Sequence, residues 1–356
     1  MKNLLKIFDS KHRSRTISYL IVIAIYIAVE LVLNFGKMPS LIKNLLVPCC
    51  CYVTCALALN LCVGISGELS LGHAGFMSIG AFTGVILSGL TTSAIPNPIL
   101  RLVICIIAGA LVTAFFGFLI GIPVLKLRGD YLAIVTLAFC QIIMSLIGNC
   151  YLGFDSKGLH FSFIKNEVSL DAGDKMLLSG PMGASGSERI STFTVGIILV
   201  IITLIIIYNL MYSKNGRAIM ACRDNRIAAS SVGIDATKTK MLAFVISAGI
   251  AGASGVLYGL NFSTMASSSF SFNQSIMILV YVVLGGLGNI TGTIISTVVL
   301  YVLPEMLRSL NDYRMIIYSL ILILMMLVSN NEKLKSWSSS LFGKIKSKFV
   351  KKEVQD

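Results

Sequence analysis

Three side chains able to do chemistry, Glu68, Ser70 and His73, lie in a glycine-rich stretch between two apolar segments. Residues 64–75 read GISGELSLGHAG, and glycine permits backbone that is not helical. In a membrane, irregular backbone and polar groups occur where they line a cavity or are buried in protein. We therefore predict a partly unwound segment lining a solute path, formed by Gly64, Gly67, Glu68, Ser70, Gly72 and His73. Alternatively, Ser70 and His73 hydrogen-bond to neighbouring carbonyls and fix helix packing.

A second polar stretch, Ser213–Lys240, separates two long apolar runs and is rich in basic residues. Its sequence, SKNGRAIMACRDNRIAASSVGIDATKTK, predicts a short helical hairpin that bends at Gly233. Small residues let a helix seat closely on a partner protein, and arginines can make charge-assisted contacts at the rim. An ordinary basic loop would explain the charge but not the small-residue spacing. We therefore expect this stretch to be the part of the chain on which another protein could act.

A third string, Leu284–Gly292, reads LGGLGNITG and lies on or between two closely spaced helices. Small residues allow helix backbones to approach one another, so helix packing is the favoured role of Gly285, Gly286 and Gly288. A subunit contact or a gate is the alternative.

A separate prediction concerns Asp130, which is expected to be the N-cap of a helix that begins at Tyr131.

Catalytic and metal-binding patterns are missing from the sequence. It contains no GxxxxGK[ST] phosphate-binding loop, and its three histidines, His12, His73 and His160, are scattered. We therefore predict that the chain is not an enzyme and binds no cofactor or metal. Most cysteines fall inside predicted membrane spans, where packing is the expected role: Cys49, Cys50, Cys51, Cys55, Cys62, Cys105 and Cys140.

The elements that must position these residues are long apolar helices. Hydrophobic residues make up 56% of the 356 residues and charged residues 13%, with a mean hydropathy of +0.86. Runs long enough to cross a bilayer recur along the chain, so the predicted class is an all-α, polytopic transmembrane bundle of about ten helices. The predicted spans are 17–35, 41–64, 70–90, 99–125, 131–150, 190–212, 241–262, 273–288, 290–307 and 313–329.

Basic residues predict the orientation of this bundle. With ten spans, both tails and the stretch 213–240 share one side, which carries most of the 29 lysines and arginines. The positive-inside rule places that side in the cytoplasm. The predicted organisation is a tail at 1–16, a membrane domain at 17–329 with an extracytoplasmic loop at 151–189, and a basic tail at 330–356. No nucleic-acid-binding motif accompanies the basic residues, so we expect them to meet anionic lipid.

The glycine-rich strings, with Arg128–Phe139 (RGDYLAIVTLAF) and the region 213–259, resemble the permease subunits of bacterial branched-chain amino acid ABC transporters, in particular the LivM type. The resemblance covers nearly all of 50–330. It implies an importer permease of the bacterial cytoplasmic membrane that works with a second, LivH-like permease. Two ATPase subunits that bind ATP and Mg²⁺, and a solute-binding protein outside the membrane, would complete the transporter.

Within this resemblance, 213–240 matches the coupling loop that docks on an ATPase. The contact residues that the resemblance implies are Gly216, Arg217, Arg223, Asp224, Arg226, Ala228, Ala229 and Gly233. One departure is Arg226, which stands where a glutamate is common, so the electrostatics of docking would differ. An inverted repeat of 41–150 and 241–329 is compatible with two oppositely oriented five-helix halves. Alternatives are a permease for a sugar, a nucleoside or urea, and a stand-alone channel or secondary carrier that uses His73 or interior carboxylates for ion coupling.

Overall fold

The computed structural model describes residues 10–35, 40–92, 94–127, 129–155, 158–162, 175–185 and 188–308, with isolated residues between 313 and 323. The chain divides into two units, Met1–Val298 and Val299–Asp356. The first unit holds all the predicted site residues. The tail at 330–356 and most of the predicted span 313–329 lie outside the described residues.

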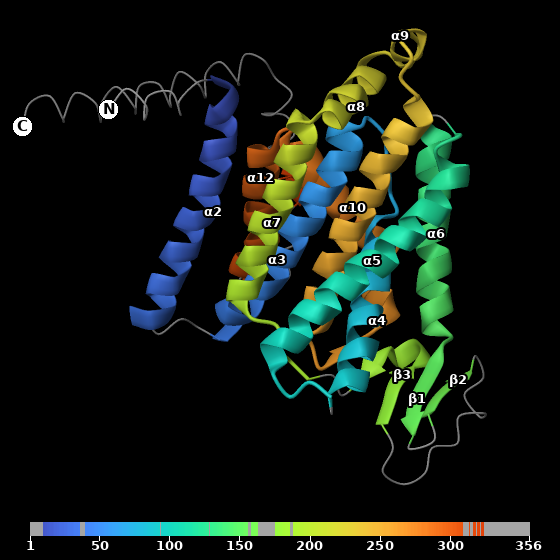
Figure 1. Ribbon diagram of the computed structural model, residues 1–356. Coiled ribbons are helices and arrows are strands. Elements are labelled where there is room, and N and C mark those ends of the chain that lie inside the picture. Colours follow the sequence, from blue (N-terminus) through green and yellow to red (C-terminus); the bar gives the residue numbers. More distant parts are fainter. Residues whose placement is uncertain are drawn as a thin grey trace, which may run out of the picture. The chain divides into compact units, whose positions relative to one another are not determined.

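Long apolar helices dominate the described chain (Figure 1). Eight helical stretches among the described residues are long and apolar enough to cross a bilayer, and α12 is a shorter apolar helix, so the predicted polytopic helical bundle is confirmed. The N-terminal helix starts before the predicted position 17. The helices are α2 Ser10–Phe35, α3 Ser40–Asn60, α4 His73–Thr91, α5 Pro98–Val124, α6 Asp130–Gly148, α7 Phe193–Tyr212, α8 Lys214–Asp224, α9 Arg226–Ser231, α10 Ala236–Gly259, α11 Phe272–Gly285 and α12 Ile290–Met306.

Helix α10 packs against α3, α4 and α5, and small residues bring these helices together. A Cβ atom on Gly80 would lie 2.0 Å from the Gly252 carbonyl oxygen, and one on Gly255 would lie 1.9 Å from the Met77 carbonyl oxygen. Such approaches are typical of membrane helices, where van der Waals packing replaces the hydrophobic driving force. The outward faces of α5 and α6 remain apolar and exposed, as residues facing lipid or another subunit would be.

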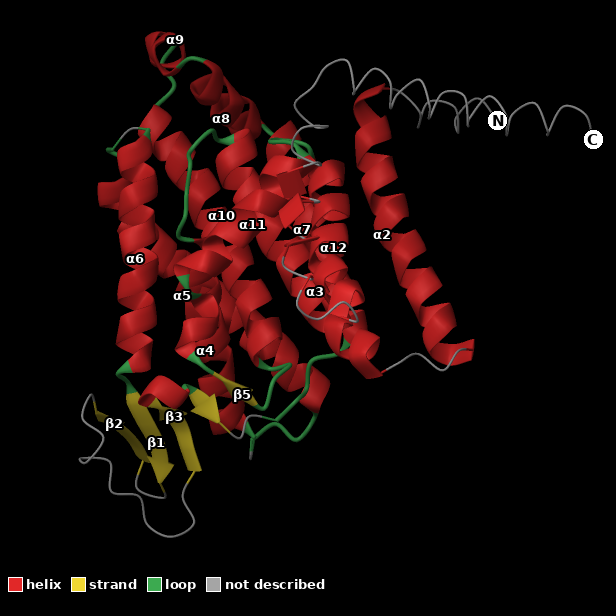
Figure 2. Ribbon diagram, turned by 180° about the vertical axis from the view of Figure 1, so that it is seen from behind, coloured by secondary structure: helices red, strands yellow, loops and turns green. Residues whose placement is uncertain are grey.

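The connection from α3 to α4 is unwound, as the glycine-rich sequence predicts. Helix α3 continues into a π-helical turn, η2 (Leu61–Ile65), and residues 66–72 then lack regular structure before α4 begins at His73. In Figure 2 this segment is a green stretch that leads down from the level of α8. Lys240 of α10 contacts Glu68, and Ser247, seven residues further along α10, contacts His73. Because a helix rises about 1.5 Å per residue, the unwound segment runs beside α10 for about 10 Å.

The loop after α6 forms most of a small β-sheet, which the hydropathy of the sequence does not predict. Its strands are antiparallel in the order β2-β1-β3-β4-β5, with Leu152 opposite Phe161 in the first pair. Figures 1 and 2 show the strands and the α8–α9 pair at opposite ends of the helices, called here the sheet end and the hairpin end. The elements are β1 Tyr151–Asp155, β2 Gly158–Ser162, β3 Lys175–Ser179, β4 Ala184–Ser185 and β5 Thr264–Met265, with short 3₁₀ turns η4 Gly180–Met182 and η5 Ser267–Phe270.

The predicted cap of α6 is wrong by one position. Helix α6 starts at Asp130, and Gly129 occupies the N-cap position with φ 59°. Glycine tolerates this left-handed conformation, whereas an aspartate N-cap would adopt an extended one. Arg128, named with Asp130 in the resembling string, lies outside the described residues.

Candidate functional site

The chain turns into the hairpin (α8, α9 and the start of α10) directly after α7. The Ser213 hydroxyl accepts a hydrogen bond from the Gly216 N–H at 3.1 Å and caps α8. A Cβ atom on Gly216 would lie 2.0 Å from the Leu210 carbonyl oxygen. Gly216 is therefore needed for the tight turn from α7, and it faces this chain.

Two breaks shape the hairpin where the sequence predicts one. Asn225 has extended backbone and caps α9, accepting from the N–H groups of Ile227 and Ala228 at 3.0 Å each. Gly233 follows with φ 84°, which glycine adopts without strain. Asp235 then caps α10, so the chain after Gly233 enters a long helix, not a second short one.

The hairpin buries some small residues and exposes two large ones. Ala229 packs with Cys222 and Ala236 in a small core of its own. Ile227 and Val232 are 84% and 75% exposed. Two large apolar side chains at such exposure on a polar element make this part of the hairpin a candidate partner surface. Sequence reasoning selected the small residues and missed these two, although apolar residues in a polar hairpin are a readable signal.

The predicted contact residues thus divide by exposure. Gly216 and Ala229 are buried within this chain, and Arg226 is half-buried. The Arg217 guanidinium donates to the Tyr212 carbonyl at 3.3 Å. The exposed members are Arg217, Arg223, Asp224, Ala228 and Gly233.

Arg223 points toward the membrane helices. Its Nη1 donates to the Gly64 carbonyl oxygen at 2.9 Å, and its Nε and Nη2 donate to Asp224 at 3.0 and 2.9 Å. Its aliphatic stem covers Gly67, where a Cβ atom would lie 2.6 Å from Arg223 Cγ. The structure therefore brings together two strings that the sequence separates by more than 150 residues.

Glu68 and Lys240 form an ion pair beside this contact. Their side chains are only 13% and 10% exposed, so each charge depends on the other for compensation. The pair links the unwound segment to the first turns of α10. Two basic side chains from different elements therefore hold the stretch Gly64–Glu68.

The third glycine-rich string, Leu284–Gly292, also contacts the end of α3 and Gly64. The Gly288 N–H donates to Asn60 Oδ1 at 2.8 Å, and Asn60 Nδ2 donates to Thr293 Oγ1 at 3.0 Å. A Cβ atom on Gly64 would lie 2.2 Å from the Gly288 nitrogen. Gly286 and Gly288 form the turn between α11 and α12 with φ of 91° and 79°.

Gly285 packs α11 directly on α12. A Cβ atom on Gly285 would lie 2.6 Å from Thr293 Cα. This geometry fits the packing role that the sequence favours for the string. A gating role stays a prediction.

A cavity of about 620 Å³ lies between the hairpin and the membrane helices. We call it the hairpin groove. It is lined by residues of the unwound segment, the α5–α6 connection and the hairpin, among them Gly67, Glu68, Leu127, Arg226, Ile227 and Lys240. A change in the position of α8 and α9 would change the width of this groove.

His73 and Ser70 are buried and bond to neighbours. His73 Nε2 lies 2.6 Å from Ser247 Oγ, which itself donates to the Ala58 carbonyl at 2.8 Å. Because that hydroxyl proton goes to Ala58, His73 must donate from Nε2. The Gly72 N–H lies 3.4 Å from the Ser70 hydroxyl. The His73 contact joins α4 to α10, whereas the Ser70 contact is local, and neither is with a carbonyl. Both the packing role and a place on the solute path stay predictions for these residues and for Gly72.

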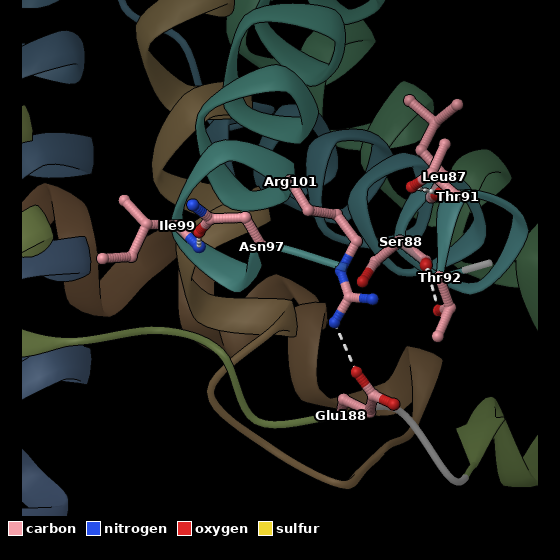
Figure 3. A network of polar contacts seen from close by, with 8 residues as sticks. All are labelled: Leu87, Ser88, Thr91, Thr92, Asn97, Ile99, Arg101 and Glu188. Carbon is pink, nitrogen blue, oxygen red and sulfur yellow. Dashed lines mark hydrogen bonds and ion pairs between the residues drawn. The ribbon is translucent and has the colours of Figure 1, made fainter. Parts of the chain in front are cut away.

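At the sheet end, a buried arginine holds the loop that precedes α7. Figure 3 shows the Arg101 guanidinium directed at Glu188, beside Ser88 of α4. The two form an ion pair in which Arg101 is 4% and Glu188 56% exposed. Arg101 Nε has no hydrogen-bond partner among the described residues. Glu188, one of the loop's acidic residues, therefore anchors the loop to α5.

With this geometry established, comparison with known proteins decides the family. A family model described as "Branched-chain amino acid transport system / permease component" matches residues 41–328. The chain belongs to this family. The match covers every part of the hairpin groove, and this permease-family membership agrees with the resemblance drawn from the glycine-rich strings.

Individual permeases of the family show how far the similarity extends. The chain is 35% identical over 293 residues to the high-affinity branched-chain amino acid transport system permease protein LivM of Salmonella typhimurium, covering 78% of this chain and 66% of that protein. The LivM protein of Escherichia coli is 34% identical with the same coverage. The Salmonella typhimurium LivH permease is 26% identical, with 78% of this chain and 89% of LivH covered. The chain thus spans just under two thirds of the LivM relatives' length, and no solved structure matches it.

Proposed function

We propose that this chain is a LivM-type permease subunit of an ATP-driven importer for branched-chain amino acids. The observation that carries the proposal is the hairpin, which presents exposed apolar side chains to a partner while Arg223 joins it to the membrane helices. The names of the LivM and LivH relatives support the substrate class. Sugars, nucleosides and urea are the other solutes to be tested.

The partners follow from this assignment. A second, LivH-like permease would complete the translocation path, and two ATPase subunits carrying ATP and Mg²⁺ would drive it. A solute-binding protein would deliver cargo at the sheet end. The ATPase would offer an apolar pocket to Ile227 and Val232 and an acidic rim to Arg226, since burying exposed apolar surface next to complementary charge gives a specific interface.

The hairpin end would then lie in the cytoplasm. Helix α3 ends at the Arg223 contact, so the preceding helix α2 starts at the same end as the hairpin. The basic residues of 213–240 are concentrated there, as the positive-inside rule requires. The membrane-facing surfaces would meet lipid and the second permease.

Co-purification tests the docking surface. The double variant Ile227→Glu/Val232→Glu should lose the ATPase subunits from the purified complex, because two charges would enter an apolar pocket. Met182→Glu is the matched control, since Met182 is 76% exposed but lies at the sheet end. It should retain the ATPases. Full ATPase retention by the double variant would overturn the assignment of this surface.

The substrate class is tested separately by competition. Uptake of labelled leucine by the complete complex should be inhibited by isoleucine and valine and not by ribose, uridine or urea. Inhibition by one of the latter group, without inhibition by valine, would assign the permease to that solute instead.

A further inference from the structure

We infer that Arg223 is a positioning residue that transmits movement of the hairpin to the broken segment between α3 and α4. This inference rests on the proposed function, because it concerns how ATP-driven motion reaches the membrane helices. It differs from the rim contact with an ATPase that the sequence predicts for Arg223. Here the residue acts inside the chain.

The Gly64 carbonyl has Arg223 as its partner because the helix breaks there. The Glu68 N–H, which would serve this carbonyl in a regular α-helix, donates to the Cys62 carbonyl at 3.1 Å instead. No other backbone N–H of the described residues donates to it. The Arg223 guanidinium therefore fills a vacancy in the backbone hydrogen bonding that the π-helical turn creates.

Arg223 also fits the segment by shape. Gly67 has φ 76° and no side chain, which lets the arginine stem lie against its backbone. Asp224 accepts from the other edge of the guanidinium and fixes its orientation. One side chain thus makes both a polar and a packing contact with the stretch Gly64–Gly67.

The segment has a second attachment, which is to α10 and does not involve α8 or α9. Lys240, in the second turn of α10, pairs with Glu68, and this pair lines the hairpin groove together with residues of α8 and α9. A displacement of α8 relative to α10 would therefore pull on Gly64 while Glu68 stays with α10. Gly64 also abuts Gly288, so the displacement would reach the α11–α12 turn as well.

The test uses the complete transporter in proteoliposomes, with both permeases, the ATPases and the binding protein. Leucine uptake and ATP hydrolysis are measured together and expressed as leucine transported per ATP. Arg223→Ala should keep its ATPase subunits and its hydrolysis but lower this ratio roughly tenfold, a typical size for coupling between sites. Arg223→Lys keeps the positive charge but lacks the planar guanidinium, so its ratio should lie between those of Arg223→Ala and the unmodified protein.

Two further variants separate linkage from docking. Gly67→Ala changes the contact from the unwound segment and should lower the ratio in the same way, since its Cβ would displace the arginine stem and its φ of 76° is strained for alanine. Lys214→Ala removes an exposed charge from the same helix α8 and should leave the ratio unchanged. If Arg223→Ala does not yield a folded complex, Gly67→Ala and Arg223→Lys decide by the same readouts.

Two results would overturn the inference. If Arg223→Ala loses the ATPase subunits, Arg223 is a docking residue. If leucine transported per ATP is unchanged in both Arg223→Ala and Gly67→Ala, Arg223 does not transmit movement to the broken segment. Neither result touches the proposed function. Absence of ATP-driven leucine uptake in the unmodified complex would be the failure of that function.

Discussion

At Gly64 the backbone of one helix passes so close to the α11–α12 turn that a side chain has no space. A Cβ atom there would lie 2.1 Å from Asn60 Oδ1 and 2.2 Å from the Gly288 nitrogen. Both neighbours are fixed, since Asn60 itself bonds the Gly288 N–H. The two glycine-rich strings therefore depend on each other through one contact.

Gly64→Ala should destabilise the protein by about 1–3 kcal/mol, because overpacking forces the backbone apart. The melting temperature of the purified protein in detergent measures this loss. Gly249→Ala is the control: its Cβ would meet Ala110 and Ala114 at 3.4 Å, an ordinary contact. The account is contradicted if the two alanine variants melt at the same temperature.

The Glu68–Lys240 pair gives a second prediction at the residue scale. Glu68→Gln leaves the nearly buried Lys240 ammonium without its counter-charge and should cost about 3–5 kcal/mol. Glu68→Leu/Lys240→Met removes both charges and should recover much of that loss. Thermal unfolding of each variant measures the effect. A double variant no more stable than Glu68→Gln would show that the charges are independent.

Residue roles were the hardest part to predict. The glycines of 64–75 correctly predicted a break in the helix, because glycine disfavours regular helix; the irregular backbone is confined to residues 66–72. The contacts of Arg223 with Gly64 and of His73 with Ser247 join segments far apart in the sequence. They depend on how the helices pack, which the spacing of residues along the chain does not predict. Ala229 was expected at a partner surface and is instead buried in the hairpin core.

At the scale of elements, polar caps define the hairpin. Ser213, Asn225 and Asp235 each accept a backbone N–H at the start of a helix, so three helices begin within a short stretch. The break at Asn225 could have been predicted, because asparagine is a preferred N-cap. The prediction of a single bend at Gly233 is therefore incomplete, since the chain also breaks at Asn225.

The Asp235 cap makes the start of α10 sensitive to acid. Backbone N–H groups of Lys238 and Thr237 hold the pKa of this exposed carboxyl below its usual value of 3.8. A lowered pKa in the folded state means that the stabilisation is present above the unfolded value and is lost as pH falls through the folded value. Asp235→Asn keeps an acceptor for the cap and removes the charge.

The variant and the unmodified protein should therefore differ in melting temperature near neutral pH, with the unmodified protein the more stable. The gap should narrow well below pH 4, where aspartate is protonated. A gap of equal size at both pH values would contradict a role for the charge.

Hydropathy predicted the long helices well, because crossing a bilayer requires long apolar runs whatever the packing. It failed for the sheet at 151–185. Those strands are only two to five residues long, and β4 pairs with β5, which lies about 80 residues further along the chain. A hydropathy average taken over the length of a membrane span does not detect strands this short.

At the scale of the whole molecule, the family match and the geometry support one account. In the proposed account, an ATPase would press on the hairpin through the exposed Ile227 and Val232, and Arg223, which bonds the Gly64 carbonyl, would pass the movement to the broken helix and the α11–α12 turn. A stand-alone carrier would need no such exposed hairpin. The account therefore predicts that transport by this chain depends on separate ATPase subunits.

ATP-driven leucine uptake by proteoliposomes tests this claim most directly. The account predicts uptake by the complete complex that requires ATP on the hairpin side of the membrane. It predicts no uptake when the ATPase subunits are omitted or when Ile227→Glu/Val232→Glu replaces the unmodified chain. Leucine uptake by the permeases alone, at a rate unaffected by ATP, would contradict it.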